Sequence, residues 1–342
     1  MDILIALLLL GVIIFIHELG HFLAARLFKM PVSEFSLGMG PELYSYYTGK
    51  TLYSIRIIPI GGFVNIDGME VDSKVENGFN SKPPLARFVV LFAGVFMNFL
   101  MALLVVVGIT FTTGQAIQNT SPVVGNILKD ANSAKVLKEN DLIKSIDGIS
   151  ISSWKDIGET ITKESKGRDI LDIVVERDGK NLELSVPLTK FEENKPLIMG
   201  IVPEYTFKRY SFTDGMGASF KIFTGIFKDT LGGIKMLVTG KVKAKDISGP
   251  VGIVKVVGDA SKSGSSGILV WLLVILSINV GIFNLLPFPA LDGGRIIFVI
   301  LELLGIKVDK KLEEKLHMVG MLILFGLIIF ATANDVFNII KF

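Results

Sequence analysis

The sequence predicts a polytopic α-helical membrane protein of about four transmembrane helices, with a small soluble domain inserted between the second and the third. Three observations lead to this prediction. Half of the 342 residues are hydrophobic, and the mean hydropathy of +0.56 is well above what a water-soluble globular protein needs. Four long stretches carry almost no charge, and charged residues return over roughly a hundred residues between the second and third stretches.

Each apolar stretch is long enough to cross a membrane, because a bilayer core of about 30 Å needs about 20 apolar residues in a helix. The stretches are residues 3–25, 88–113, 263–291 and 316–334. The third is too long for one simple span, so its Ser/Gly-rich start is expected to be an approach loop. We therefore expect an N-terminal membrane half at 1–114 and a C-terminal membrane half at 263–342.

The inserted domain is expected at residues 115–202. Within it, "KENDLIKSIDGISISS" and "LDIVVERDGKNLELSVPL" alternate polar and apolar residues around Gly turns, which is typical of strands. Residues 156–166 have helix-like spacing between those strands. The pattern predicts a small mixed α/β or mainly β domain.

Residues 203–262 are expected to link this domain to the second membrane half. Lys221, Lys228 and Lys235 recur there every seven residues with apolar residues around the other face, so the segment predicts an amphipathic helix in the membrane interface. Residues 51–66, "TLYSIRIIPIGGFVNI", predict two short strands joined at residues 59–62. Such a hairpin is apolar enough to enter a membrane, although an ordinary surface hairpin is an equally good interpretation.

Charge and cysteine content exclude several classes. The net charge is +2 from 35 basic and 33 acidic residues, without a long basic run, which argues against a nucleic-acid partner. With no cysteine in the chain, disulfides and thiolate metal sites are excluded, so any metal must be held by His, Asp or Glu.

Lysine and arginine gather in residues 26–87 and 295–315, which four spans would place on one side. Positive charge favours the cytoplasmic side of a cell's inner membrane. The inserted domain and both chain ends are then expected outside the cytoplasm.

The first apolar stretch contains His17-Glu18-Leu19-Gly20-His21, an H-E-x-x-H pattern. Residues four apart share one helix face, so two imidazoles can bind one Zn²⁺ while the glutamate reaches a metal-bound water. The competing interpretation is two helical histidines with unrelated roles. Imidazole and carboxylate groups are costly inside a membrane, which favours the metal site.

A catalytic zinc ion needs a third protein ligand, for which the sequence offers Asp292 and His317. Asp292 follows two prolines that interrupt a helix and precedes two glycines that allow close backbone approach. The predicted topology brings Asp292 to the same depth as His17 and His21. Asp292 is therefore the stronger candidate, and His317 is more readily an interfacial residue.

These motifs resemble those of the site-2 protease family of intramembrane zinc metalloproteases. The residues that carry the resemblance are H-E-L-G-H at 17–21 and Asn284, Pro287, Pro289, Asp292 and Gly293 in "NLLPFPALDGG". The bacterial RseP type is similar over most of the chain, through "IPIGGFVNIDGME", "FAGVFMNFLMA", "SGPVGI" and a PDZ module at 115–202. Val95 departs from the proline that is common in relatives, and a single PDZ module departs from tandem members.

The resemblance implies a zinc-dependent endopeptidase that cleaves transmembrane segments of single-span proteins, such as anti-sigma factors or remnant signal peptides. Its metal ligands would be His17, His21 and Asp292, with Glu18 as the general base. The substrate backbone would be held by Asn284 and by the hairpin at Gly61, Gly62 and Phe63. The PDZ module would bind an extended peptide or a carboxy terminus, filter substrates by size, or only cover the site.

Two other functions, a membrane adaptor and a zinc transporter, fit parts of the sequence. A membrane adaptor with an inactive metal site would use the PDZ module alone, but it has no use for Glu18. A zinc transporter needs a polar path across all spans, and the four stretches carry too few polar residues for one. Asn98, a lone polar residue in the second stretch, is more often a helix-packing contact than a substrate ligand.

Overall fold

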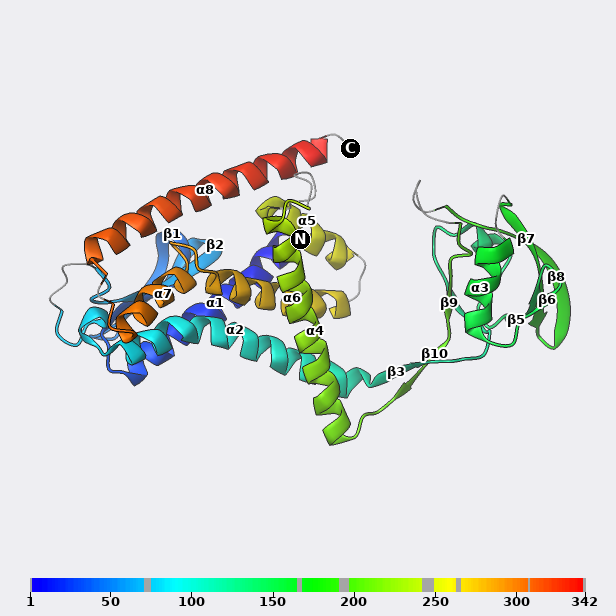
Figure 1. Ribbon diagram of the computed structural model, residues 1–342, viewed down its shortest axis with the longest axis horizontal. Helices are drawn as coiled ribbons and strands as arrows, with labels where there is room; N and C mark the ends of the chain where they lie inside the picture. The colour runs from blue at the N-terminus through cyan, green and yellow to red at the C-terminus, as the bar shows by residue number, and fades with distance from the viewer. Residues whose placement is uncertain are drawn as a thin grey trace. The chain divides into compact units, whose positions relative to one another are not determined.

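The computed structural model describes residues 2–70, 75–164, 168–190, 197–241, 249–262, 266–306 and 308–340. The chain forms two compact units, each described by itself: unit 1 consists of Met1–Gly108 with Met216–Phe342, and unit 2 of Ile109–Gly215 (Figure 1). Ser248 of the predicted "SGPVGI" motif lies outside the described residues.

Within the described part of the chain, four helices are long and apolar enough to cross a membrane, judged by length and composition. They are α1 (Asp2–Leu27), α2 (Pro84–Thr113), α6 (Ser266–Leu285) and α8 (Lys310–Ile340). These helices correspond to the four predicted stretches, because runs of apolar residues without charge or proline leave a helix as the favoured structure.

The helices of unit 1 pack through two clusters of buried apolar residues. Buried residues of α1 and α2 meet residues of the strands and of the short helix α7 (Asp292–Leu303), while the N-terminal half of α1 packs against α6 and α5 (Pro250–Lys262). An ion pair of 2.5 Å between Arg87 and Glu302 joins α2 to α7. This packing brings α1, α2 and the start of α7 together.

The strands β1 (Val32–Tyr47) and β2 (Leu52–Ile66) correct the predicted hairpin at 51–66. Residues 51–66 do not pair with themselves. Residues 34–37 of β1 lie between two parts of β2 and have partners in 62–65 on one side and in 52–55 on the other. Strand β1 was not predicted because Gly38, Gly40 and Pro41 interrupt its alternating pattern.

Helices α4 (Phe212–Val238) and α8 make further contacts within unit 1. Helix α4 covers the predicted amphipathic segment, and Thr230 on it donates a 2.8 Å hydrogen bond to the Asn279 side chain of α6. Helix α8 contacts the start of α5 through Asp335, whose carboxylate accepts hydrogen bonds from the Gly249 and Gly252 amides at 2.8–3.0 Å.

Unit 2 is a mixed α/β domain. Its main sheet has the order β6-β5-β7-β8, formed by Ile149–Ser150, Leu142–Ile146, Ile170–Arg177 and Lys180–Pro187. Helix α3 (Trp154–Glu164) packs its buried residues on this sheet. Two pairs complete the unit, β4 (Val124–Ile127) with β9 (Ile201–Pro203) and β3 (Gln115–Gln118) with β10 (Tyr205–Lys208). The predicted mixture of strands with one helix is therefore observed.

Candidate metal centre

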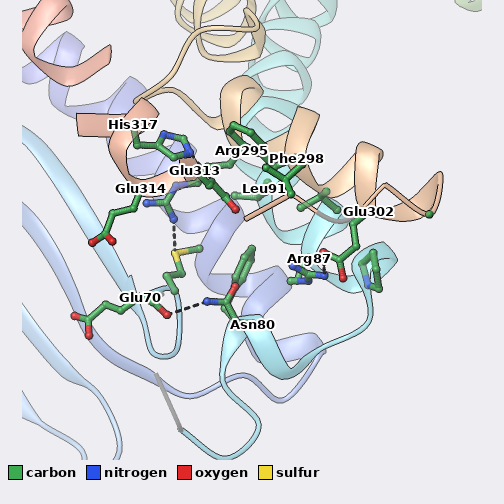
Figure 2. Close-up of a pocket in the computed structure, with 16 residues that line it drawn as sticks. Glu70, Asn80, Arg87, Leu91, Arg295, Phe298, Glu302, Glu313, Glu314 and His317 are labelled. Carbon is green, nitrogen blue, oxygen red and sulfur yellow. Dashed lines mark hydrogen bonds and ion pairs between the residues drawn. The ribbon is translucent and has the colours of Figure 1, made fainter. Parts of the chain in front are cut away.

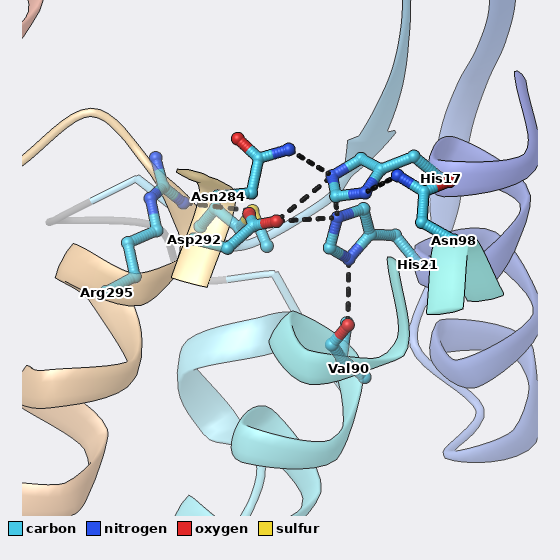
Figure 3. A network of polar contacts seen from close by, with 8 residues as sticks. His17, His21, Val90, Asn98, Asn284, Asp292 and Arg295 are labelled. Carbon is cyan, nitrogen blue, oxygen red and sulfur yellow. Dashed lines mark hydrogen bonds and ion pairs between the residues drawn. The ribbon is translucent and has the colours of Figure 1, made fainter. Parts of the chain in front are cut away.

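Three predicted ligands come together between α1 and α7. His17 and His21 lie on one face of α1, and both side chains are buried. Their Nε2 atoms are 3.2 Å apart. The Oδ2 atom of Asp292, the first residue of α7, lies 3.1 Å from His17 Nε2 and 3.2 Å from His21 Nε2 (Figure 3). Among the described residues, these three form the group of His, Asp and Glu side chains whose atoms could share one ion.

The chain break between α6 and α7 positions Asp292. Helix α6 ends at Leu285, and prolines at 287 and 289 prevent it from continuing. A Cβ atom on Gly293 would lie 2.3 Å from the Leu286 carbonyl oxygen, so only glycine lets α7 start this close to the end of α6. Asp292 is thereby directed back towards α1.

The side chain of His21 is oriented by α2. Its Nδ1 donates a 2.8 Å hydrogen bond to the Val90 carbonyl oxygen. A carbonyl can only accept, so the proton is on Nδ1 and the lone pair of the neutral ring is on Nε2. Such a hydrogen bond is the usual support of a metal-binding imidazole.

His17 has two asparagine neighbours. Nδ2 of Asn284, on α6, lies 3.3 Å from His17 Nε2, and Nδ2 of Asn98, on α2, lies 3.4 Å from His17 Nδ1. Asn98 is completely buried. The sequence favoured a packing contact for Asn98, and the structure places its side chain against His17. A lone asparagine in the uncharged run of α2 is the signal that could have indicated a polar neighbour.

The three donor atoms fit a zinc ion. Bonds of about 2.0–2.1 Å in a tetrahedral arrangement separate ligand atoms by about 3.3 Å, close to the spacing of the triangle described above. Asp292 Oδ2 is buried and, apart from these close contacts, accepts no hydrogen bond within the described residues. Two imidazoles and one carboxylate are also a donor set that zinc accepts at catalytic sites.

Glu18 and the edge of the sheet complete one cavity of about 470 Å³. The Glu18 carboxylate accepts a hydrogen bond from the Val64 backbone amide of β2. The lining includes the three candidate ligands, Glu18, Phe63, Val64 and Asn284. The arrangement therefore combines a metal-binding triad, an acidic side chain and a strand edge.

The predicted substrate residues are only partly brought together. Phe63 and Asn284 line the cavity. Gly62 lies beside it, since a Cβ atom there would be 3.8 Å from Glu18 Cγ. Gly61 is not among the described lining residues; its φ of +86° turns the chain just before this edge.

His317 belongs to a different cavity, of about 660 Å³, shown in Figure 2. Its Nδ1 accepts a 3.0 Å hydrogen bond from the Ala290 amide, which joins α8 to the segment before Asp292. The two cavities share Met69, Leu91 and Arg295. His317 thus supports the broken segment and is absent from the triad.

Comparisons with known proteins find relatives over nearly the whole chain. The family model described as Peptidase family M50 matches residues 5–327. FN1322 of Fusobacterium nucleatum, named as a candidate zinc metalloprotease, is 51% identical over 99% of each chain. CPE1693 of Clostridium perfringens, named in the same way, is 34% identical over 98% of each chain. The regulator of sigma-W protease RasP of Bacillus subtilis is 28% identical over 95% of this chain and 96% of its own.

A solved PDZ domain from an SdrC-like protein of Listeria monocytogenes aligns with 25% of this chain and 90% of its own at 25% identity. The TM-score of 0.23 is too low for an inference about unit 2. The family model, in contrast, covers both halves of the triad and nearly the whole chain. The chain therefore belongs to peptidase family M50, the site-2 protease family of metalloproteases that its paired motifs predicted.

Proposed function

We propose that the chain is a zinc-dependent endopeptidase that cleaves transmembrane segments of single-span membrane proteins. The observation that carries the proposal is the position of the triad: His17, His21 and Asp292 share one cavity with Glu18, in a unit whose long helices could cross a membrane. Charged and metal-binding groups in such helices are expensive unless they serve a function.

His17, His21 and Asp292 would hold the metal. Bound there, zinc supplies Lewis acidity, which lowers the pKa of a coordinated water and polarises the scissile carbonyl. The protein's part is to hold the three ligand atoms within a fixed triangle and, through the Val90 carbonyl, to keep His21 in the tautomer that leaves its Nε2 free for the metal.

Glu18 would act as the general base and acid. It would take a proton from the attacking water and deliver it to the leaving amine. Because Val64 donates a hydrogen bond to the Glu18 carboxylate, the side chain is held in the cavity beside the strand edge. A fixed carboxylate at this place can reach both the water and the amide of a bound peptide.

The edge of β2 at 62–66 would hold the substrate backbone. A substrate helix hides its carbonyls in internal hydrogen bonds, so it must unwind before attack. An extended segment can then add to the sheet edge by main-chain hydrogen bonds. Phe63 and Asn284 line the cavity beside that edge, which supports their roles in contacting the substrate, with Gly61 and Gly62 shaping the edge.

Unit 2 would act as a PDZ module. Its antiparallel sheet with one packed helix offers strand edges at which an extended peptide or a carboxy terminus could bind. A size filter for substrates is the other role that fits an inserted domain. One relative is named a regulator of sigma-W protease, which makes a single-span anti-sigma factor the first substrate to test, ahead of remnant signal peptides.

The test of the reaction is co-expression of the full chain with a single-span reporter. Glu18→Gln should abolish cleavage while the abundance of the protein and its zinc content, about one ion per chain, stay unchanged. Asp292→Ala should lose both cleavage and zinc. Undiminished cleavage by Glu18→Gln would refute the mechanism, and a wild-type chain that binds zinc but never cleaves would favour the adaptor function.

The orientation is tested separately. We propose that the protein lies in the cytoplasmic membrane with unit 2 outside and the β1–β2 turn at the cytoplasmic side, because basic residues gather near that turn. The chain has no cysteine, so a single introduced cysteine is the one site that a maleimide can label. An impermeant maleimide should label Lys180→Cys in intact cells and Lys50→Cys only after permeabilisation; the reverse pattern would invert the topology.

A further inference from the structure

Asn98 lies against the metal ligand His17 on the side away from the ion site. Its side chain is completely buried, and its Nδ2 atom lies 3.4 Å from His17 Nδ1 (Figure 3). Its Oδ1 is buried and has no hydrogen-bond partner among the described residues. A buried amide oxygen without a hydrogen-bond partner is energetically unfavourable, and it is rare in folded proteins. Its position beside a candidate metal ligand suggests a role at the metal site.

The tautomer of His17 supplies that explanation. If Nε2 binds the metal, the neutral ring carries its proton on Nδ1, and that N–H must donate. The amide nitrogen of Asn98 also donates, so a contact between Asn98 Nδ2 and His17 Nδ1 would place two hydrogen-bond donors against each other. Amide oxygen and nitrogen are assigned from the hydrogen bonds they make. Turning the amide brings Oδ1 to His17 Nδ1 and moves Nδ2 to the position where the oxygen had no partner. The turn thereby replaces a contact between two donors with a hydrogen bond from the imidazole N–H to the amide oxygen.

The second imidazole shows the same arrangement with a different acceptor. His21 Nδ1 donates to the Val90 carbonyl of α2 at 2.8 Å. Asn98 lies eight residues further along the same helix, about two turns away. Helix α2 therefore places one polar group beside the Nδ1 atom of each histidine of α1, a backbone carbonyl at His21 and a side-chain amide at His17.

We propose that Asn98 is a positioning residue whose Oδ1 accepts the Nδ1 proton of His17 and so holds its Nε2 towards the metal. The inference rests on the metal role proposed above. It assigns Asn98 neither to substrate binding nor to simple helix packing. The alternative is a packing contact alone. In that case only the volume of the side chain would matter, and its hydrogen-bonding groups would not.

Three variants of the full chain separate these roles. Asn98→Leu keeps much of the volume but removes the acceptor, whereas Asn98→Asp keeps an acceptor. Ser277→Ala is the matched control, because the Ser277 hydroxyl donates a 2.9 Å hydrogen bond to the Asn98 backbone carbonyl and so tests packing at the same place. The readouts are the zinc dissociation constant, measured by competition with a chromophoric chelator, and the visible absorption spectrum with Co²⁺.

Asn98→Leu should weaken zinc binding by about 10–100-fold, the usual effect of losing such a support, and should alter the Co²⁺ spectrum. Asn98→Asp and Ser277→Ala should stay close to wild type in both readouts. Equal zinc binding by Asn98→Leu and wild type would overturn the inference, as would equal weakening by Asn98→Leu and Asn98→Asp. A wild-type chain that binds no zinc would instead refute the proposed function, and the inference with it.

Discussion

At the scale of single residues, Gly94 sets how closely α2 approaches the histidines of α1. A Cβ atom at Gly94 would lie 2.4 Å from His21 Nε2 and 2.9 Å from His17 Cε1. Real Cβ atoms do not approach other atoms so closely. The His21 ring is held by its hydrogen bond to the Val90 carbonyl of α2, and the His17 ring lies against Asn98 of the same helix. The absence of a side chain at this one position therefore leaves the space that the two rings occupy.

Gly94→Ala is predicted to displace the imidazoles and to weaken zinc binding by at least about tenfold, because ligand atoms must keep their places within a few tenths of an ångström. The measurement is the zinc dissociation constant of the purified chain. Gly108→Ala, on the same helix and with no heavy atom within 4 Å of its added Cβ, is the matched control. Equal zinc affinity in the two variants would contradict this prediction, because it would mean that the His17 and His21 rings can move aside without weakening zinc binding.

How far the sequence predicts the site also depends on the residue. His17 and His21 follow from helix periodicity, which is local, and Asp292 follows from a carboxylate at a broken helix. The contacts of Asn98 and Gly94 with these ligands could not be predicted in the same way. They depend on the rotation of α2 about its axis relative to α1, which hydropathy leaves undetermined because apolar residues lie around most of the circumference of α2.

At the scale of elements, helix α3 of unit 2 begins with a reciprocal cap. The Asp156 carboxylate accepts hydrogen bonds from the Ser152 hydroxyl and from the Ser153 amide, both at 2.8 Å. The Asp156 amide donates to the Ser153 hydroxyl at 3.4 Å. This is the capping box, in which two otherwise unpaired amides at a helix start are satisfied together. The hydrogen bonds from Ser152 and Ser153 lower the pKa of Asp156 below its ordinary value of 3.8.

The sign of the pH dependence follows from that lowered pKa. Stability contributed by Asp156 is fully present above pH 3.8 and is lost as the pH falls through the lower pKa of the folded state. Asp156→Asn should therefore expose the first amides of α3 to faster hydrogen exchange at neutral pH, and the difference from wild type should shrink as the solution is acidified below pH 3.8. Glu159→Gln, an exposed position on the same helix, should show neither effect. A difference that does not change with pH would mean that the carboxylate charge is irrelevant to the cap.

The sheet of unit 1 shows where element prediction fails. The apolar residues of β2 were recognised as strand, but their partner was sought within the same segment, because a Pro-Ile-Gly-Gly sequence is typical of a turn. In the structure, this sequence carries the chain from one side of β1 to the other. Strand pairing between distant segments is set by tertiary packing, which alternation along one segment does not encode.

At the scale of the whole molecule, the triad draws its ligands from the two sequence segments that form unit 1. His17 and His21 come from its first helix, whereas Asp292 opens α7, beyond the inserted unit 2. The four apolar runs allowed the four long apolar helices to be predicted, because the helix-forming signal lies within each run. A metal held by all three side chains would bind only the folded arrangement of unit 1, and so it would stabilise that unit by mass action.

Removal of the metal is accordingly predicted to destabilise unit 1 and to spare unit 2. Free zinc at about a thousand times its dissociation constant contributes about 4 kcal/mol, which a strong chelator should abolish. Hydrogen exchange of the full chain would then speed up around α1 and α7, while the β5, β7 and β8 amides of unit 2 keep their protection. Asp292→Ala should resemble the chelated wild type and respond no further to chelator. Equal loss of protection in both units would contradict this account, because it would require the metal to support strands that contain none of its ligands.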